Sequence, residues 1–148
     1  MALKEKVLAL DVGEARIGLA LGELGSSFAF GRGYLTRKSL ETDILALKNL
    51  LTKENASYFV IGLPRRTDGA DSAQTERVRA FAAALEAAGL SYDFEDERFT
   101  TRMAGQNILK SGKKKKQRQE KGLLDEASAI LILESYLSRK KQAKLDTP

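Results

Sequence analysis

The chain contains no histidine and no cysteine among its 148 residues. The lack of cysteine excludes disulfides, thiolate zinc sites and a cysteine nucleophile, and it fits a reducing compartment. The lack of histidine excludes the Ser-His-Asp and Cys-His arrangements and removes the commonest general base. Carboxylates are therefore the main side chains through which this chain could perform polar chemistry.

Long apolar runs are also missing. No stretch approaches the ~20 apolar residues that cross a bilayer, so we expect a soluble, cytoplasmic protein with no membrane partner. With 43% hydrophobic content, the chain can bury one core but is too short for two lobes. We expect a single domain over residues 1–138, followed by a polar C-terminal tail over residues 139–148.

Positive charge is concentrated in one segment. The six cations and one acid between residues 113 and 121 account for the whole net charge of +5. Residues 110–122 offer nothing apolar to bury, which predicts a flexible basic loop between two helices. A solvated lysine face is the simpler explanation, but the position just before Asp125 favours binding of nucleic-acid phosphates. The candidate phosphate ligands in this loop are Lys113, Lys114, Lys115, Lys116 and Arg118.

The hydrophobic pattern predicts a mixed sheet with helices on both faces. Gly13 lies in a short turn that would join the first two strands as a hairpin, and later strands alternate with helices, which indicates parallel crossovers. Ser39 and Thr100 are expected to cap helices, and Gly89 to end one. We expect strands over residues 7–10, 16–21, 28–35, 58–63 and 90–94, and helices over 39–51, 72–88, the segment after 100, and 123–137.

Acidic residues lie where these expected elements end or begin. Asp11 ends the first strand, Asp96 and Glu97 follow the fifth, and Asp125 opens the last helix. The carboxyl ends of parallel strands meet at one edge of a sheet, and Asp125 shares a helical stripe with positions 129, 132 and 136, which should face the sheet. Carboxylates suit hard cations such as Mg²⁺ or Mn²⁺, which assist phosphodiester hydrolysis.

Each acid also has a simpler explanation on its own. Asp125 can favour the positive end of the helix dipole, and Asp11 can hydrogen-bond its own backbone in the turn before Gly13. Asp96 and Glu97 can form only a charged turn. It is the convergence of these positions on one edge that predicts a metal site.

The motifs that contain these acids resemble those of the YqgF family, in the family's order and over residues 7–137. That family comprises bacterial ribonuclease H-like proteins described as Holliday junction resolvases and as pre-16S ribosomal RNA nucleases. Departures at Glu14-Ala15, Arg65-Arg66 and Ser128 do not affect the acids. The matching segments are Leu10-Asp11-Val12-Gly13, residues 16–20, residues 61–64, Asp68-Gly69, residues 96–101 and Asp125 with the apolar run that follows it.

The resemblance implies an α/β, ribonuclease H-like fold with a five-stranded mixed sheet whose first three strands are antiparallel. It also implies that Asp11, one acid of the Asp96-Glu97 pair, and Asp125 are catalytic ligands of Mg²⁺ or Mn²⁺. We favour Glu97 within the pair because of its longer reach, with Asp96 holding the turn or supporting the site. The arginines expected to contact backbone phosphates are Arg16, Arg65, Arg66 and Arg98.

The favoured function is a metal-dependent nuclease that acts on RNA and processes the 5′ end of precursor 16S rRNA. The first alternative is a Holliday junction resolvase, which would need a twofold homodimer to cut branched DNA symmetrically. A non-catalytic RNA-binding assembly factor is the second alternative. An actin-like ATPase is a further alternative, but it is disfavoured because it would need two lobes and the chain is long enough for one. The aromatic residues Phe28, Phe30, Tyr34 and Phe99 are expected to pack in the structure and to provide no base-stacking platform.

Overall fold

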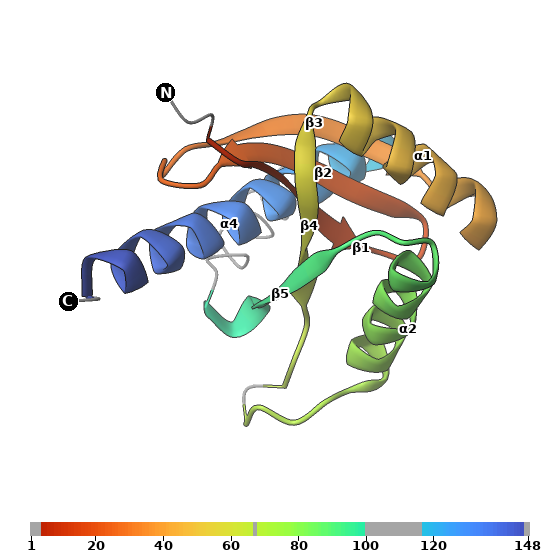
Figure 1. The fold of residues 1–148 in the computed structure, drawn as a ribbon. Coiled ribbons are helices and arrows are strands. Elements are labelled where there is room, and N and C mark those ends of the chain that lie inside the picture. Colours follow the sequence, from red (N-terminus) through yellow and green to blue (C-terminus); the bar gives the residue numbers. More distant parts are fainter. Residues whose placement is uncertain (1–3, 67, 100–116, 147–148) are drawn as a thin grey trace.

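The computed structural model describes residues 4–66, 68–99 and 117–146, with the backbone alone for residues 99, 117–120 and 144–146. Five strands form one sheet in the order β3-β2-β1-β4-β5 (Figure 1). This arrangement confirms the predicted mixed sheet. The elements are β1 (Lys6–Val12), β2 (Arg16–Glu23), β3 (Ala29–Thr36), α1 (Leu40–Lys53), β4 (Ala56–Leu63), α2 (Ala73–Ala87), β5 (Tyr92–Asp96), a short 3₁₀ helix η1 (Glu97–Phe99) and α4 (Gln117–Asp146).

Strand β1 lies at the centre of the sheet and is buried on both faces. It pairs antiparallel with β2 and parallel with β4, while β3 pairs antiparallel with β2 and β5 parallel with β4. Leu8 and Leu10 point into one core, and Val7 and Ala9 into the other. The apolar run is continuous because both of its faces need apolar side chains. Because side chains alternate between the two faces along a strand, Asp11 points to the same face as Val7 and Ala9.

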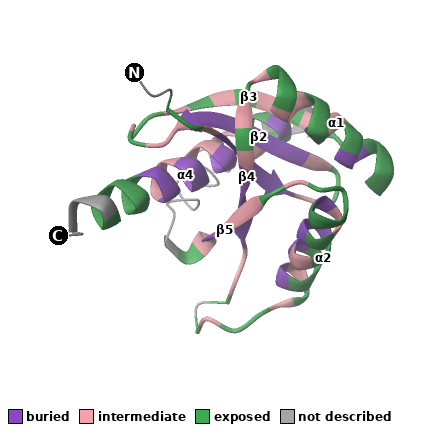
Figure 2. Ribbon diagram, viewed as in Figure 1, coloured by how far each residue is buried: buried purple, intermediate pink, exposed green. Residues whose placement is uncertain are grey.

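Helices cover both faces of the sheet, as predicted (Figure 2). Ile44 and Leu47 of α1 and Phe81 and Leu85 of α2 belong to the core on one face. Buried residues of α4, including Ile132, form the core on the other. Asp11 therefore lies on the face that α4 covers.

Local signals explain where the first two helices begin and end. Ser39 caps α1, since its side chain accepts a hydrogen bond from the backbone N of Thr42 at 3.1 Å. Gly89 follows α2 with φ of +80°, a left-handed conformation that ends a helix at little cost for glycine. Both predictions are confirmed.

The last helix is longer than predicted. It begins at Gln117 and ends at Asp146, so residues 117–122 are helical rather than part of a loop, and residues 139–146 are helical rather than part of a tail. Lysine, arginine, glutamine and glutamate are good helix formers, and a lack of apolar residues shows only that a segment is not buried. Residues 110–116 and the helix predicted after Thr100 lie outside the described residues. In the described part of the chain, no helix is both long and apolar enough to cross a membrane.

Candidate active site

Asp11 lies near the end of β1 between two glycines. Asp11 is 4% exposed, and it pairs with Gly18 on β2. On the other side, Leu10 pairs with Ile61 of β4, so Gly62 is the next residue along that strand. Because neither flanking glycine carries a side chain, α4 and Glu97 can approach the sheet closely around Asp11.

Gly18 allows α4 to approach the sheet beside Asp11. A Cβ atom at this glycine would lie 1.9 Å from the carbonyl oxygen of Asp125. Asp125 is eight residues beyond the start of α4, and the helix dipole acts mainly within the first turn, so the dipole explanation does not account for it. The residues that share its stripe, Ala129 and Ile132 among them, are buried against the sheet, as predicted.

Glu97 approaches the same surface from the end of β5. A Cβ atom at Gly62 would lie 2.8 Å from Oε1 of Glu97, so this carboxylate lies over β4 at the level of Asp11. Alternation along β5 explains this placement, because Asp93 and Glu95 also point towards α4, where they bond to its side chains. The structure thus brings Asp11, Glu97 and Asp125 to one face of the sheet.

Asp96 belongs to a different environment. Nη2 and Nε of Arg98 donate to Oδ2 of Asp96 at 2.7 and 3.0 Å, and Nη1 of Arg65 lies 3.6 Å from the same oxygen. Burial alone would raise the pKa of Asp96, but the hydrogen bonds and charge of Arg98 outweigh burial and hold the pKa below its usual 3.8. These contacts give Asp96 a structural role at the turn, which favours Glu97 as the ligand of the pair.

Asp125 is paired with a cation in this structure. Nε of Arg16 donates to Oδ2 of Asp125 at 2.7 Å, and the two side chains are only 25% and 20% exposed. Within residues 4–66, 68–99 and 117–146, no three acidic side chains form a group with the geometry of a metal site. The acids are therefore gathered on one face but are not closed into a ligand cluster.

The other arginines expected to contact phosphate also have acidic partners. Nη2 of Arg66 lies 3.1 Å from Oδ2 of Asp68. Arg65 lies between Asp96 and Asp71, and the Nε of Arg65 is 3.5 Å from Oδ1 of Asp71. Arg65 and Arg66 follow the end of β4, and Arg65 contacts Asp96 at the end of β5. The predicted phosphate ligands Lys113, Lys114, Lys115 and Lys116, and the side chain of Arg118, lie outside the described residues.

The ion pair that Arg139 of α4 forms with the buried Glu95 of β5 is not predicted by the sequence pattern. Glu95 is fully buried; Oγ of Ser135 donates to its Oε2 at 2.6 Å, and Nε of Arg139 donates to its Oε1 at 3.0 Å. Hydrogen bonding to Glu95 is also the main reason why the pKa of Arg139 is raised. Alternation along β5 could have placed Glu95 on the face of Glu97, but its partners are about forty residues away in sequence and could not have been identified.

A second polar group joins the same two elements to β4. The hydroxyl of Tyr136 donates to Oδ2 of Asp93 at 2.8 Å and lies 2.9 Å from the hydroxyl of Tyr58. Burial, followed by these hydrogen bonds, raises the pKa of Tyr136 far above its usual value. Its phenol therefore stays protonated and holds the middle of α4 on the sheet.

The expectation that the aromatic residues pack is wrong for two of them. Phe28 and Phe30 are 69% and 60% exposed. They lie at the edge strand β3, which no neighbouring strand covers in the described sheet, and a hydrophobic pattern does not show which strand is at an edge. Tyr34 packs only in part: a Cβ atom at Gly122 of α4 would lie 2.3 Å from its ring, but the residue is 41% exposed. The side chain of Phe99 lies outside the described residues.

Comparison with known proteins identifies relatives over nearly the whole chain. A family model described as "RuvX: Holliday junction resolvase" matches residues 5–139. A Thermus thermophilus protein named "Putative pre-16S rRNA nuclease" is 48% identical over 90% of this chain and 98% of the relative. The "Ribonuclease YqgF" of Deinococcus radiodurans is 41% identical over 90% of this chain and 88% of the relative.

The fold is also similar to a solved structure. Thermus thermophilus RuvC, in complex with a Holliday junction substrate, aligns with a TM-score of 0.55 at 11% identity, over 91% of this chain and 96% of that chain. At this identity the likeness concerns the fold alone, and it confirms the predicted ribonuclease H-like architecture. The family match and the close relatives confirm the resemblance found in the sequence. This chain belongs to the RuvX family of Holliday junction resolvases, whose members include the proteins named YqgF.

Proposed function

We propose that this protein is a divalent-metal-dependent nuclease that hydrolyses phosphodiester bonds in RNA and processes the 5′ end of precursor 16S rRNA in the cytoplasm. The observation that carries the proposal is the approach of three acids from β1, η1 and α4 to one sheet face, where Gly18 and Gly62 permit close approach. The names of the relatives, which include pre-16S rRNA nucleases, support RNA as the substrate.

The chemistry of the donor set suits Mg²⁺ or Mn²⁺. Asp11, Glu97 and Asp125 offer hard oxygen ligands, and Mg²⁺ is held by a few carboxylates together with water and substrate phosphate. When bound, such ions activate water as the nucleophile and stabilise the leaving oxygen, so no histidine base is needed. Arg16 would have to share or release Asp125 for this carboxylate to serve as a ligand.

The chain's own cations would position the substrate. Arg65, Arg66 and Arg98 lie at the same ends of β4 and β5 as Glu97 and can contact backbone phosphates. The segment from residue 113 to residue 121, which precedes Asp125 in the sequence, adds further positive charge. If all six cations of that segment contact phosphate, the log-log salt dependence of binding has a slope of roughly −5.

A second candidate is resolution of four-way DNA junctions, which the description of the family favours. Two symmetric cuts require a twofold homodimer with two active sites. Trimming an RNA precursor requires one site and a path for one strand. The two candidates therefore differ in both substrate and oligomeric state.

A side-by-side cleavage assay tests the proposal. Purified protein with Mn²⁺ receives precursor 16S rRNA and a four-way DNA junction, and cleavage of the RNA is expected. Asp11→Asn should reduce the rate by at least roughly 100-fold, as expected for loss of a group that acts in the transition state. Glu76→Gln, which removes an exposed acid of α2, is the matched control and should cleave normally.

Three other outcomes would contradict the proposal. Symmetric nicks in the junction with intact RNA would establish the resolvase instead. RNA binding without cleavage by the unaltered protein would indicate a non-catalytic assembly factor. Full activity of Asp11→Asn would show that the acids are not the catalytic site.

A further inference from the structure

The exposed Phe30 lies on the opposite face of the sheet from the acids. Phe30 pairs with Leu21 on β2, which pairs with Leu8 on β1, and directly paired residues of neighbouring strands point to the same face. Leu8 and Leu21 belong to the core under α1 and α2, whereas Asp11 continues the alternation of Val7 and Ala9 on the face that α4 covers. The surface around Phe30 is therefore separate from the proposed active site.

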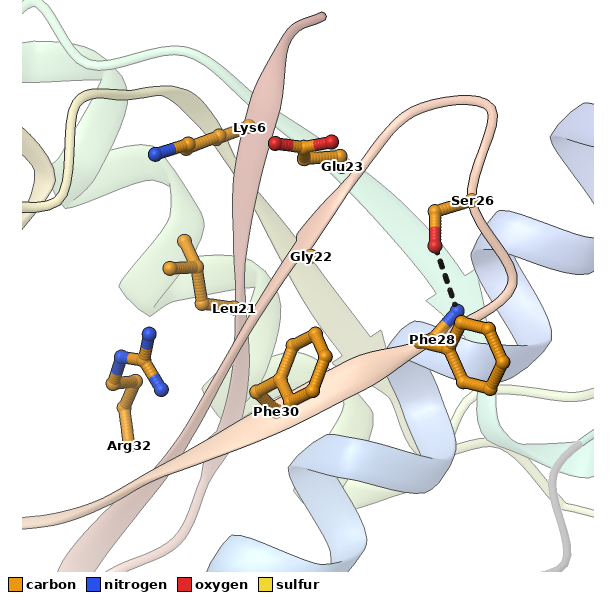
Figure 3. A pocket seen from close by; sticks show the side chains of 8 residues that line it. All are labelled: Lys6, Leu21, Gly22, Glu23, Ser26, Phe28, Phe30 and Arg32. Carbon is orange, nitrogen blue, oxygen red and sulfur yellow. Dashed lines mark hydrogen bonds between the residues drawn. The ribbon is translucent and has the colours of Figure 1, made fainter.

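This surface is a groove of about 300 Å³ at the sheet edge (Figure 3). Its lining combines aromatic, apolar and charged side chains. The groove shares Lys6 and Glu23 with a second hollow of about 680 Å³, to which Lys4, Asn55 and Ser57 contribute. The side chains that line the first groove include Lys6, Leu21, Glu23, Phe28, Phe30 and Arg32.

Local contacts fix the turn before β3 and the guanidinium of Arg32. The backbone N of Phe28 donates to Oγ of Ser26 at 3.1 Å, which fixes the turn before β3. Nε of Arg32 donates to Oε2 of Glu54 at 3.0 Å, and its Nη1 donates to the carbonyl of Gly31 at 3.1 Å. The ring of Phe28, which immediately precedes β3, and the ring of Phe30 and the guanidinium of Arg32, both on β3, thus line one groove.

We infer that this groove, defined by Phe28, Phe30 and Arg32, binds the unpaired bases of a single-stranded nucleic acid. Exposed aromatic rings and arginine planes on a strand are the surfaces on which proteins stack splayed bases. Lys4 and Lys6, at the border of the two hollows, can contact the phosphates of the same strand. The inference rests on the proposed function, because it assigns the groove to the same nucleic-acid substrate.

A second copy of this chain fits the groove less well. Self-association through an edge strand requires a regular run of free backbone groups. Here the β2–β3 register shifts between Gly18 and Ala20, and Gly33 has φ of +75°. Such an irregularity bends and twists the edge and disfavours pairing with another strand.

Binding without hydrolysis tests the inference. Fluorescence anisotropy with a short fluorescein-labelled single-stranded RNA, in EDTA, measures affinity independently of the metal site, and a blunt RNA duplex of the same length is the second probe. Phe28→Ala/Phe30→Ala should weaken single-strand binding by roughly tenfold or more, given the contribution of each stacked base. Duplex binding should change far less. Leu45→Ala is the matched control, because Leu45 is 58% exposed on α1 and outside the groove.

A second variant separates stacking from general apolar contact. Phe28→Leu/Phe30→Leu keeps apolar bulk without aromatic faces, so it should also lose single-strand affinity. Unchanged single-strand affinity in both double variants would overturn the inference. A dimer in the unaltered protein that both variants dissociate, with RNA affinity intact, would overturn it in favour of a self-association surface. Loss of cleavage in Asp11→Asn with normal binding leaves the groove intact, so the two proposals fail separately.

Discussion

Arg16 and Asp125 form an ion pair, with 2.7 Å between Nε of Arg16 and Oδ2 of Asp125. The backbone of Asp125 packs over Gly18, which pairs with Asp11. The pair joins the start of β2 to the part of α4 that carries the proposed metal ligand. Arg16 therefore holds Asp125 near the other acids while occupying one of its oxygens. A metal ion that uses this carboxylate has to compete with the guanidinium.

Replacement of Arg16 tests this competition. Arg16→Gln should increase Mn²⁺ affinity by roughly twofold to fivefold, because a partly exposed ion pair contributes no more than about 1 kcal/mol. Isothermal titration calorimetry measures the affinity. Arg77→Gln is the control, since Arg77 pairs with Glu14 on an exposed surface and should leave Mn²⁺ binding unchanged. Weaker Mn²⁺ binding by Arg16→Gln would show that Arg16 supports the site rather than competing for it.

Gly18 should be needed for activity because it admits α4. Gly18→Ala would place Cβ 1.9 Å from the carbonyl oxygen of Asp125, which is backbone and must move. We expect a loss of about 1–3 kcal/mol in the free energy of unfolding and a large loss of cleavage. Urea denaturation and the RNA cleavage assay measure the two effects.

Gly22→Ala separates stability from activity in this experiment. Gly22 faces the same helix, but its Cβ would meet α4 only at the flexible side-chain ends of Leu137 and Leu133, at 2.9 and 3.1 Å, and outside α4 the backbone carbonyl oxygen of Phe28 at 3.1 Å. This variant should lose stability and keep its cleavage rate. Equal loss of cleavage in both variants would mean that the position of Asp125 is not what matters.

Asp96 and Glu97 should differ in function although they are adjacent. Glu97→Gln should abolish Mn²⁺-dependent cleavage, because its carboxylate lies over Gly62 beside Asp11. Asp96→Asn should retain cleavage, because Arg98 and Arg65 engage that carboxylate instead. The opposite pattern in the cleavage assay would reverse the assignment of the ligand.

Asp96 should also contribute stability that depends on pH. Its pKa is lower in the folded protein than its usual 3.8, so the carboxylate stabilises the fold above that value. The contribution disappears as the pH falls through the lowered pKa. In thermal unfolding at neutral pH, the Tm of Asp96→Asn should therefore be lower than that of the unaltered protein. The two Tm values should converge in strong acid. A constant difference over that range would contradict the assigned ion pair.

Arg139 should stabilise the protein by compensating the buried charge of Glu95. Arg139→Ala should cost about 3 kcal/mol, at the low end for breaking a buried pair, because Arg139 is 53% exposed and Ser135 still donates to Glu95. Glu95→Leu/Arg139→Met removes both charges and should cost less than the single change. If urea denaturation shows the double variant to be less stable than Arg139→Ala, this explanation is contradicted.

Much of the fold was predictable because its signals are local. The apolar run of β1, the cap at Ser39 and the glycine after α2 each depend on neighbouring residues. The candidate ligands Asp11, Glu97 and Asp125 could be proposed from their places at the ends of strands and on a helical stripe. The preference for Glu97 over Asp96 agrees with alternation along β5.

The features that were missed depend on residues distant in sequence. Glu95 is buried only because Arg139 and Ser135 reach it from α4. Phe28 and Phe30 are exposed because β3 is at the edge of the sheet, which follows from the strand order and not from hydrophobicity. The length of α4 was underestimated because its ends lack apolar residues, although their helix propensity is high.

Diffraction from a crystal soaked in Mn²⁺ tests the central claim most directly. The anomalous signal locates the ion independently of any substrate or assay. We predict a peak within coordination distance of carboxylate oxygens of Asp11, Glu97 and Asp125, with Arg16 displaced from at least one oxygen of Asp125. Full occupancy of Mn²⁺ elsewhere, with the Arg16–Asp125 pair unchanged and no peak beside Asp11, would contradict the account.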